Sequence, residues 1–151
     1  MNQNRLLLLK GPESPFLLVS QEDKLHVFNL IMLVSEDEKL IHSEVNLPIK
    51  RTFNMVETEE FVIVVGLKQI SWTFKNDLFV NREGFQTSFS VEDYTEIRSV
   101  KVNPLNSGYV GVLNDKNKFY LVNLNGTERE ELIEFERYVY EDMDTSIAEL
   151  E

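Results

Sequence analysis

The feature of this sequence that most limits its possible folds is a two-strand pattern that occurs three times. The three segments are FLLVSQEDKLHVFNL from Phe16, FVIVVGLKQISWTF from Phe61 and YVGVLNDKNKFYLVNL from Tyr109. Each contains a run rich in β-branched and aromatic residues, a short turn and a second such run, which is the pattern of a β-hairpin. The starts of the segments lie 45 and 48 residues apart. A period of this size indicates that one supersecondary unit is repeated along the chain.

The same short, alternating pattern extends over most of the 151 residues and predicts an all-β fold. Polar turns separate several of the runs, at 21–24, 66–68 and 114–117. The predicted strands are 5–10, 15–20, 25–34, 40–47, 49–56, 61–65, 69–74, 78–81, 85–91, 97–102, 109–113 and 119–124.

Further strands flank the three hairpins and make each repeat larger. RTFNMVE from Arg51 precedes the second hairpin, and IRSVKVNPLNS from Ile97 precedes the third. LIHSEVNL from Leu40 and FQTSFSV from Phe85 follow the first two hairpins. A strand, a hairpin and an outer strand make a four-stranded antiparallel unit, and the blades of WD40-type β-propellers are such units with a period of about 40–45 residues. The sequence therefore predicts a partial or divergent propeller of about three blades.

The third repeat, VKVNPLNSGYVGVLNDKNKFYLVNL from Val100, is similar to a WD40-like blade. Val122-Asn123 occupies the place of the Trp-Asp pair, and the Gly-His pair is absent, so the segment resembles the divergent propellers of nucleoporins. It looks most like the N-terminal propeller of the nucleoporin 88/82 family, and it also resembles the propeller of the RNA polymerase I core-factor subunit. The nucleoporin resemblance implies a scaffold subunit of the nuclear pore, located at the nuclear envelope.

The character of the sequence changes after residue 126. Thr127 and Glu130 form a capping box, and Leu132, Phe135 and Val139 follow at helical spacing. We therefore predict a helix over 128–140, and we divide the chain into a β-rich propeller-like domain (1–126) and a C-terminal helix with an acidic tail (127–151). Leu132, Phe135 and Val139 would pack on the sheet of the same domain. The helix carries more apolar residues than that face needs, so some of its apolar residues could instead bind a partner. The candidate partner-binding residues are Ile133, Phe135, Tyr138 and Tyr140.

Three blades are fewer than the about four to eight of a closed propeller, so strand edges would remain unpaired. A protein partner or a second copy of the chain could complete the ring of sheets. Alternatively, the strands could close into a small β-barrel of the pleckstrin-homology type, capped by the C-terminal helix, that binds a phosphoinositide or a peptide. Lys50-Arg51 is the only basic pair near a predicted loop, and this disfavours the lipid-binding alternative.

The sequence contains no pattern of an enzyme or of a cofactor site. The two histidines, His26 and His42, lack the spacing of metal ligands, and no P-loop, GxGxxG or GxSxG motif occurs. Acidic pairs are abundant but lie in predicted turns, so a hydrolase that uses two carboxylates is a third, weaker possibility. We expect no catalytic residues, no cofactor, no bound metal and no small-molecule ligand.

Composition limits the compartment and the partners. The chain has no cysteine, which fits a reducing cytoplasmic or nuclear compartment. Its net charge of −11 argues against a broad nucleic-acid-binding surface. No apolar run approaches the roughly 20 residues of a membrane span. We therefore expect a non-enzymatic, intracellular protein–protein interaction module or scaffold subunit.

Overall fold

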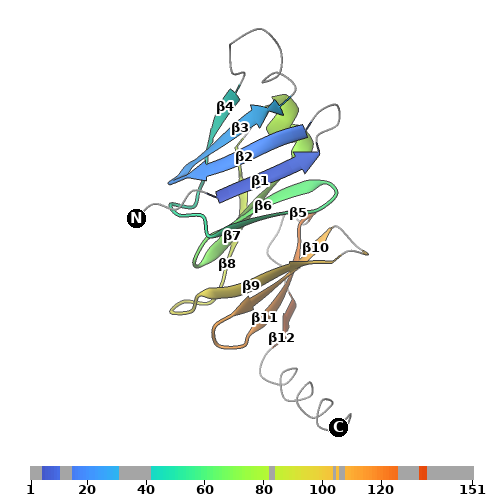
Figure 1. The fold of residues 1–151 in the computed structure, drawn as a ribbon. Helices are drawn as coiled ribbons and strands as arrows, with labels where there is room; N and C mark the ends of the chain where they lie inside the picture. Colours follow the sequence, from blue (N-terminus) through green and yellow to red (C-terminus); the bar gives the residue numbers. More distant parts are fainter. Residues whose placement is uncertain are drawn as a thin grey trace, which may run out of the picture. The chain divides into compact units, whose positions relative to one another are not determined.

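The described residues of the protein form three four-stranded antiparallel β-sheets that follow one another along the chain (Figure 1). This computed structural model describes residues 5–10, 15–30, 42–81, 84–103, 105, 108–125 and 133–135. Each sheet pairs strands that are neighbours in sequence, so every sheet is a meander. The prediction of an all-β fold with three propeller-like blades is confirmed, and the described residues form no closed barrel.

The first sheet contains β1 (Arg5–Lys10), β2 (Pro15–Gln21), β3 (Lys24–Asn29) and β4 (His42–Asn46), in that spatial order. The predicted polar turn lies between β2 and β3, and Glu22 in it has a φ of 55°. The predicted strand over 25–34 is shorter than expected, because β3 ends at Asn29 and residues 31–34 lie outside the described part of the chain.

The second sheet contains β5 (Asn54–Glu57), β6 (Phe61–Val65), β7 (Gln69–Phe74) and β8 (Thr87–Ser90), in that order. The predicted strand over 78–81 is wrong, because η1 (Asp77–Asn81) is a turn of π-helix. Short apolar runs do not distinguish a strand from a helical turn, and packing decides here.

Packing explains why η1 coils. Leu78 is fully buried in the core, and the ring of Phe79 stacks on that of Phe16, with centroids 4.1 Å apart and planes inclined by 6°. Two consecutive apolar residues can both contact the core from a helical turn, whereas in a strand they would point to opposite faces.

The third sheet contains β9 (Ile97–Val102), β10 (Tyr109–Asn114), β11 (Phe119–Asn123) and β12 (Ile133–Phe135), in that order. The prediction of a C-terminal helix is wrong where the structure describes the segment, because β12 pairs with β11 and completes the third meander. The rest of 128–140 lies outside the described residues. The predicted domain boundary after residue 126 stays a prediction, although the pairing of β11 with β12 joins the two sides of it.

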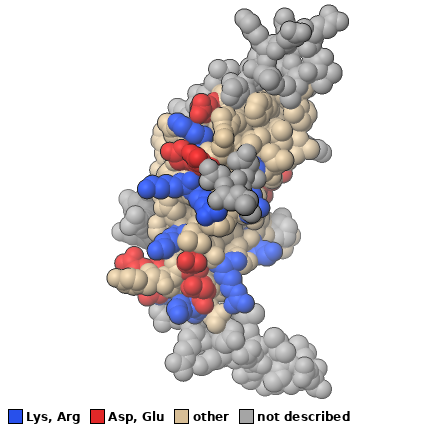
Figure 2. Space-filling model, turned by 60° about the vertical axis from the view of Figure 1, so that its left-hand side comes forward, with Lys and Arg blue, Asp and Glu red and all other residues tan. Residues whose placement is uncertain are grey.

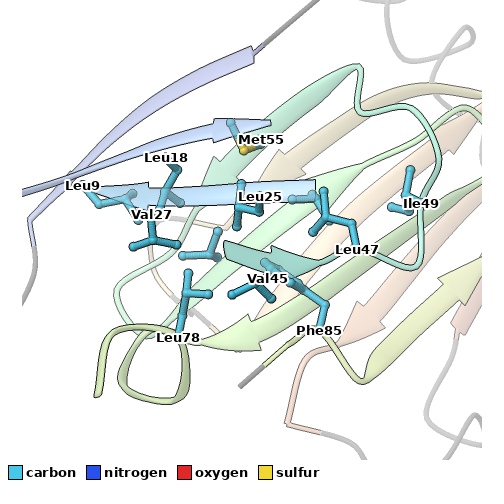
Figure 3. Packing of buried hydrophobic residues seen from close by; sticks show 12 residues of the cluster. Leu9, Leu18, Leu25, Val27, Val45, Leu47, Ile49, Met55, Leu78 and Phe85 are labelled. Atoms are coloured by element: carbon cyan, nitrogen blue, oxygen red, sulfur yellow. The ribbon is translucent and has the colours of Figure 1, made fainter. Parts of the chain in front are cut away.

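The chain divides into two compact units, Met1–Ser90 and Val91–Glu151. In the first unit, the first and second sheets share one apolar core, whose side chains lie between the two sheets (Figure 3). In the second unit, one face of the third sheet carries the buried residues Val110, Val112, Tyr120 and Val122. The core of the first unit comprises Leu9, Leu18, Leu25, Val27, Val45, Leu47, Ile49, Met55, Val62, Val64, Leu78 and Phe85.

A buried asparagine fixes the turn between β10 and β11. The side-chain oxygen of Asn114 accepts hydrogen bonds from the amides of Lys116 (3.0 Å) and Lys118 (2.8 Å). Its side-chain nitrogen donates to the hydroxyl oxygens of Thr95 (3.3 Å) and Tyr120 (3.5 Å). Asn114 is fully buried, so these bonds satisfy polar groups that water cannot reach.

Among the described residues, no helix is long and apolar enough to cross a membrane.

Candidate interaction surface

Strand β1 is apolar on both of its faces, yet only one face is buried. Its sequence RLLLLK places leucine at four consecutive positions, and alternate residues of a strand point to opposite sides of the sheet. Leu9 is 1% exposed in the core, and Leu7 packs against the same core. On the other side, Leu6 is 67% exposed and Leu8 is 61% exposed.

The exposed side of β1 continues across the sheet as an apolar surface. Leu6 lies opposite Val19 and Leu8 lies opposite Leu17 in the register of β1 with β2. Leu17 in turn lies opposite Phe28 on β3. Directly opposed residues of antiparallel strands share a face, with Cβ atoms about 5 Å apart. We call this surface the open face; it consists of Leu6, Leu8, Leu17, Val19 and Phe28.

The far side of the open face is polar. His26 lies beside Phe28, with ring centroids 6.4 Å apart, and opposite Glu44 on β4. The Lys24 ammonium lies 4.0 Å from the Glu44 carboxylate and donates a hydrogen bond to the side-chain oxygen of Asn46. An apolar centre next to a charged, solvated margin is the usual composition of a protein–protein interface.

Strand β6 shows what a continuous apolar run normally indicates in this fold. Its five residues FVIVV are all buried, so both faces of the strand are covered. Strands covered on both sides are typically continuous hydrophobic runs, whereas strands with one solvated side alternate. The composition of β1 is that of a strand covered on both sides, but one side of β1 is exposed.

Among the described side chains of the third sheet, no large apolar one is as exposed as Leu6 or Leu8. The ring of Phe119 lies over Gly111, and a Cβ atom on that glycine would lie 2.9 Å from the ring. Tyr109, Leu113 and Leu121 are half-buried. The remaining large exposed apolar side chains of the described residues are Phe53, Leu67, Phe74, Tyr94 and Leu105.

The predicted partner-binding residues are only partly placed. Ile133 and Phe135 lie on β12, where Leu121 and Phe119 are their backbone partners. Tyr138 and Tyr140 lie outside the described residues. The structure describes only two of the four, so their role stays a prediction.

The histidines belong to one sheet. His26 lies on β3, and His42 begins β4 as the backbone partner of Phe28. In the described part of the chain, no group of three or more His, Asp or Glu side chains is arranged to hold a metal ion.

Sequence reasoning missed the open face. The sequence predicted a strand over 5–10, but it was not recognised that a strand with four consecutive leucines, Leu6 to Leu9, should be covered on both sides. That signal was available in the sequence, but the exposure of one side was not.

Comparisons with known proteins support the architecture. No protein-family model and no curated protein matches the chain. A chain of the yeast heterotrimeric Nup82–Nup159–Nup116 nucleoporin complex is similar in structure, with a TM-score of 0.56 and 12% identity over 89% of this chain. A chain of ctPRC2 in complex with H3K27me3 and H3K27M is similar, with a TM-score of 0.57 and 8% identity over 86% of this chain.

The fold is β-propeller-like. This chain spans 33% of the first of these structures and 28% of the second, so it corresponds to about a third of the chains it resembles. The similarity concerns the fold, and the sequences are too different to carry more than that.

Proposed function

We propose that this protein is a non-enzymatic interaction module that packs its open face against another protein chain as a subunit of a larger assembly. The observation that carries the proposal is the exposure of Leu6 and Leu8 on a strand whose composition is that of a strand covered on both sides. The first sheet already makes a contact of this kind through its other face, which packs against the second sheet.

The energy available at the open face suits such a contact. Covering a leucine that is about two-thirds exposed contributes about 1–2 kcal/mol, so the two leucines together contribute about 2–4 kcal/mol. The half-buried Leu17, Val19 and Phe28 add area around them. Association also costs translational and rotational freedom, so further contacts must accompany the two leucines.

A nuclear-pore role is the assembly we favour. The sequence of the third blade resembles the nucleoporin 88/82 family, and one of the similar structures is a nucleoporin complex. Both similarities support a scaffold subunit at the nuclear envelope.

The proposal is tested by the mass of the purified chain in solution, measured by light scattering over a range of concentrations. We expect the average mass to exceed the 17.7 kDa of one chain and to rise with concentration, because the open face has only other copies to contact. Leu6→Thr combined with Leu8→Thr keeps residues suited to a strand, and we expect this variant to have the mass of one chain.

Leu105→Thr is the matched control, because Leu105 is 95% exposed and lies outside the open face. It should associate as the unaltered chain does. A chain that keeps the mass of one copy at every concentration would contradict the proposal, as would association that the double variant leaves unchanged.

A further inference from the structure

Two chain segments meet at one end of the second sheet. The amide of Phe53 donates to the carbonyl oxygen of Val65 at 2.8 Å, which places the segment before β5 beside the turn between β6 and β7. The side-chain amide of Gln69 donates to the carbonyl oxygen of Pro48 at 3.0 Å. Ile49 packs so closely on Gly66 that a Cβ atom there would lie 2.7 Å from the isoleucine Cγ2. Residues 48–53 and 66–69 therefore form one continuous surface.

This surface is cationic and partly apolar. Lys50, Arg51 and Lys68 are exposed, and neither segment contains an aspartate or a glutamate. The side chains of Phe53 and Leu67 are 38% and 40% exposed. The guanidinium of Arg51 lies 5.5 Å from the centre of the Phe53 ring, in a cation–π contact. We call these five residues the cationic patch.

Its local charge is opposite to that of the whole chain, because the acidic excess is unevenly distributed. Residues 127–151 contain ten acidic and two basic residues, whereas the chain as a whole has 26 acidic and 15 basic residues. On the face that Figure 2 shows, the basic and acidic side chains of the described residues are interspersed. The strand-forming part of the molecule can therefore carry a local cationic site despite the net charge of −11.

We propose that the cationic patch binds an acidic peptide segment of a partner protein that also carries aromatic or aliphatic side chains. The carboxylates would lie near Lys50 and Lys68, and the apolar side chains would contact Phe53 and Leu67. A purely anionic ligand would leave those two exposed apolar residues unused.

An anionic membrane fits the same surface less well. Recognition of lipid headgroups typically needs about four to eight clustered basic residues, and the patch has three. A chain with a net charge of −11 is also repelled from a negative surface at long range.

The experiment is a titration of the isotope-labelled full chain with a synthetic peptide, followed by amide chemical shifts in NMR. The probe is ERYVYEDMDTSIAELE, the sequence of residues 136–151, which combines six acidic residues with tyrosine, isoleucine and leucine. The labelled chain carries Glu141→Gln, Asp142→Asn and Asp144→Asn, so that its own segment does not compete with the probe. We expect shifts at residues 48–53 and 66–69, and weaker binding in 1 M salt, where the Debye length falls to about 3 Å.

A pair of double variants tests which lysines are responsible. We expect Lys50→Glu with Lys68→Glu to weaken binding at least about tenfold, because each reversal removes an attraction and introduces a repulsion. Lys101→Glu with Lys116→Glu makes the same change of charge at exposed lysines outside the patch and should change affinity less than about twofold.

Three results would overturn the proposal. The first is the absence of shifts at the patch. The second is equal binding of a probe in which the acidic residues are replaced by glutamine. The third is binding to vesicles that contain a phosphoinositide, with no binding of the peptide. The double variant Lys50→Glu/Lys68→Glu leaves the open face unchanged, so failure here is separate from failure of the proposed function.

Discussion

Leu8 and Leu9 are adjacent leucines on one strand, and the structure predicts opposite consequences for replacing them. Leu9 is 1% exposed and lies in the core, so Leu9→Ala should lower the free energy of unfolding by about 2–5 kcal/mol through lost burial and the cavity left behind. Leu8 is 61% exposed, so Leu8→Ala in the isolated monomer should change that free energy by about 0.5 kcal/mol or less. For a chain of this length, the first change corresponds to a fall of at least about 5 °C in Tm.

The assay is urea unfolding followed by the fluorescence of Trp72, the single tryptophan of the chain, which is 5% exposed on β7. Because the chain divides into two units, a probe inside Met1–Ser90 reports the unit that contains both leucines. A loss for Leu8→Ala as large as that for Leu9→Ala would refute the assignment of faces. A shift of β1 by one residue against β2 would exchange the two faces and give the reverse order of effects.

Three further substitutions test the packing of each unit by the same kind of unfolding measurement. Gly66→Ala should destabilise the first unit by about 1–3 kcal/mol, because the new Cβ would lie 2.7 Å from the side chain of Ile49. Ile49 is 4% exposed and cannot move aside into solvent, so an unchanged stability would contradict this packing. Asn114→Ala should lower the free energy of unfolding of the second unit by about 2–4 kcal/mol, because it leaves amides of the β10–β11 turn without acceptors. Circular dichroism will follow this unit, and an unchanged stability would show that the turn does not need the side chain. Thr52→Val should leave stability unchanged or raise it by about 1 kcal/mol, because the Thr52 hydroxyl oxygen is buried without a hydrogen-bond partner; a clear loss would reveal a bond that the structure does not contain.

The fold was largely predictable because its pairing is local. Each sheet is a meander, so a hairpin signal in the sequence corresponds directly to two paired strands in space. The polar turns and the presence of flanking strands in the first two repeats were also predicted correctly, although the strand predicted over 49–56 begins only at Asn54.

The two errors have a common cause, which is that local signals were given more weight than the repeat. The apolar run at residues 78–81 was assigned to a strand, although β8 already supplied the fourth strand of that sheet. The segment containing Ile133 and Phe135 was assigned to a helix from its capping box and spacing, although the third repeat still lacked its fourth strand. Tertiary pairing overrides helix propensity where a sheet edge is available.

Neither candidate surface could be read from the sequence. The open face depends on which side of β1 is covered, and alternation cannot reveal this when both sides are leucine. The cationic patch depends on Lys68 lying near Lys50 and Arg51, which are 17 or more residues away in the sequence, and only the contacts between the two segments establish this.

The most direct test of the central claim is to observe the leucine methyl groups of the purified chain by NMR while the protein is diluted. If the open face is where another chain packs, the methyl signals of Leu6 and Leu8 will shift with concentration, and those of Leu9 and Leu18 in the core will not. Concentration-dependent shifts confined to other surfaces, or the absence of any shift, would contradict the account.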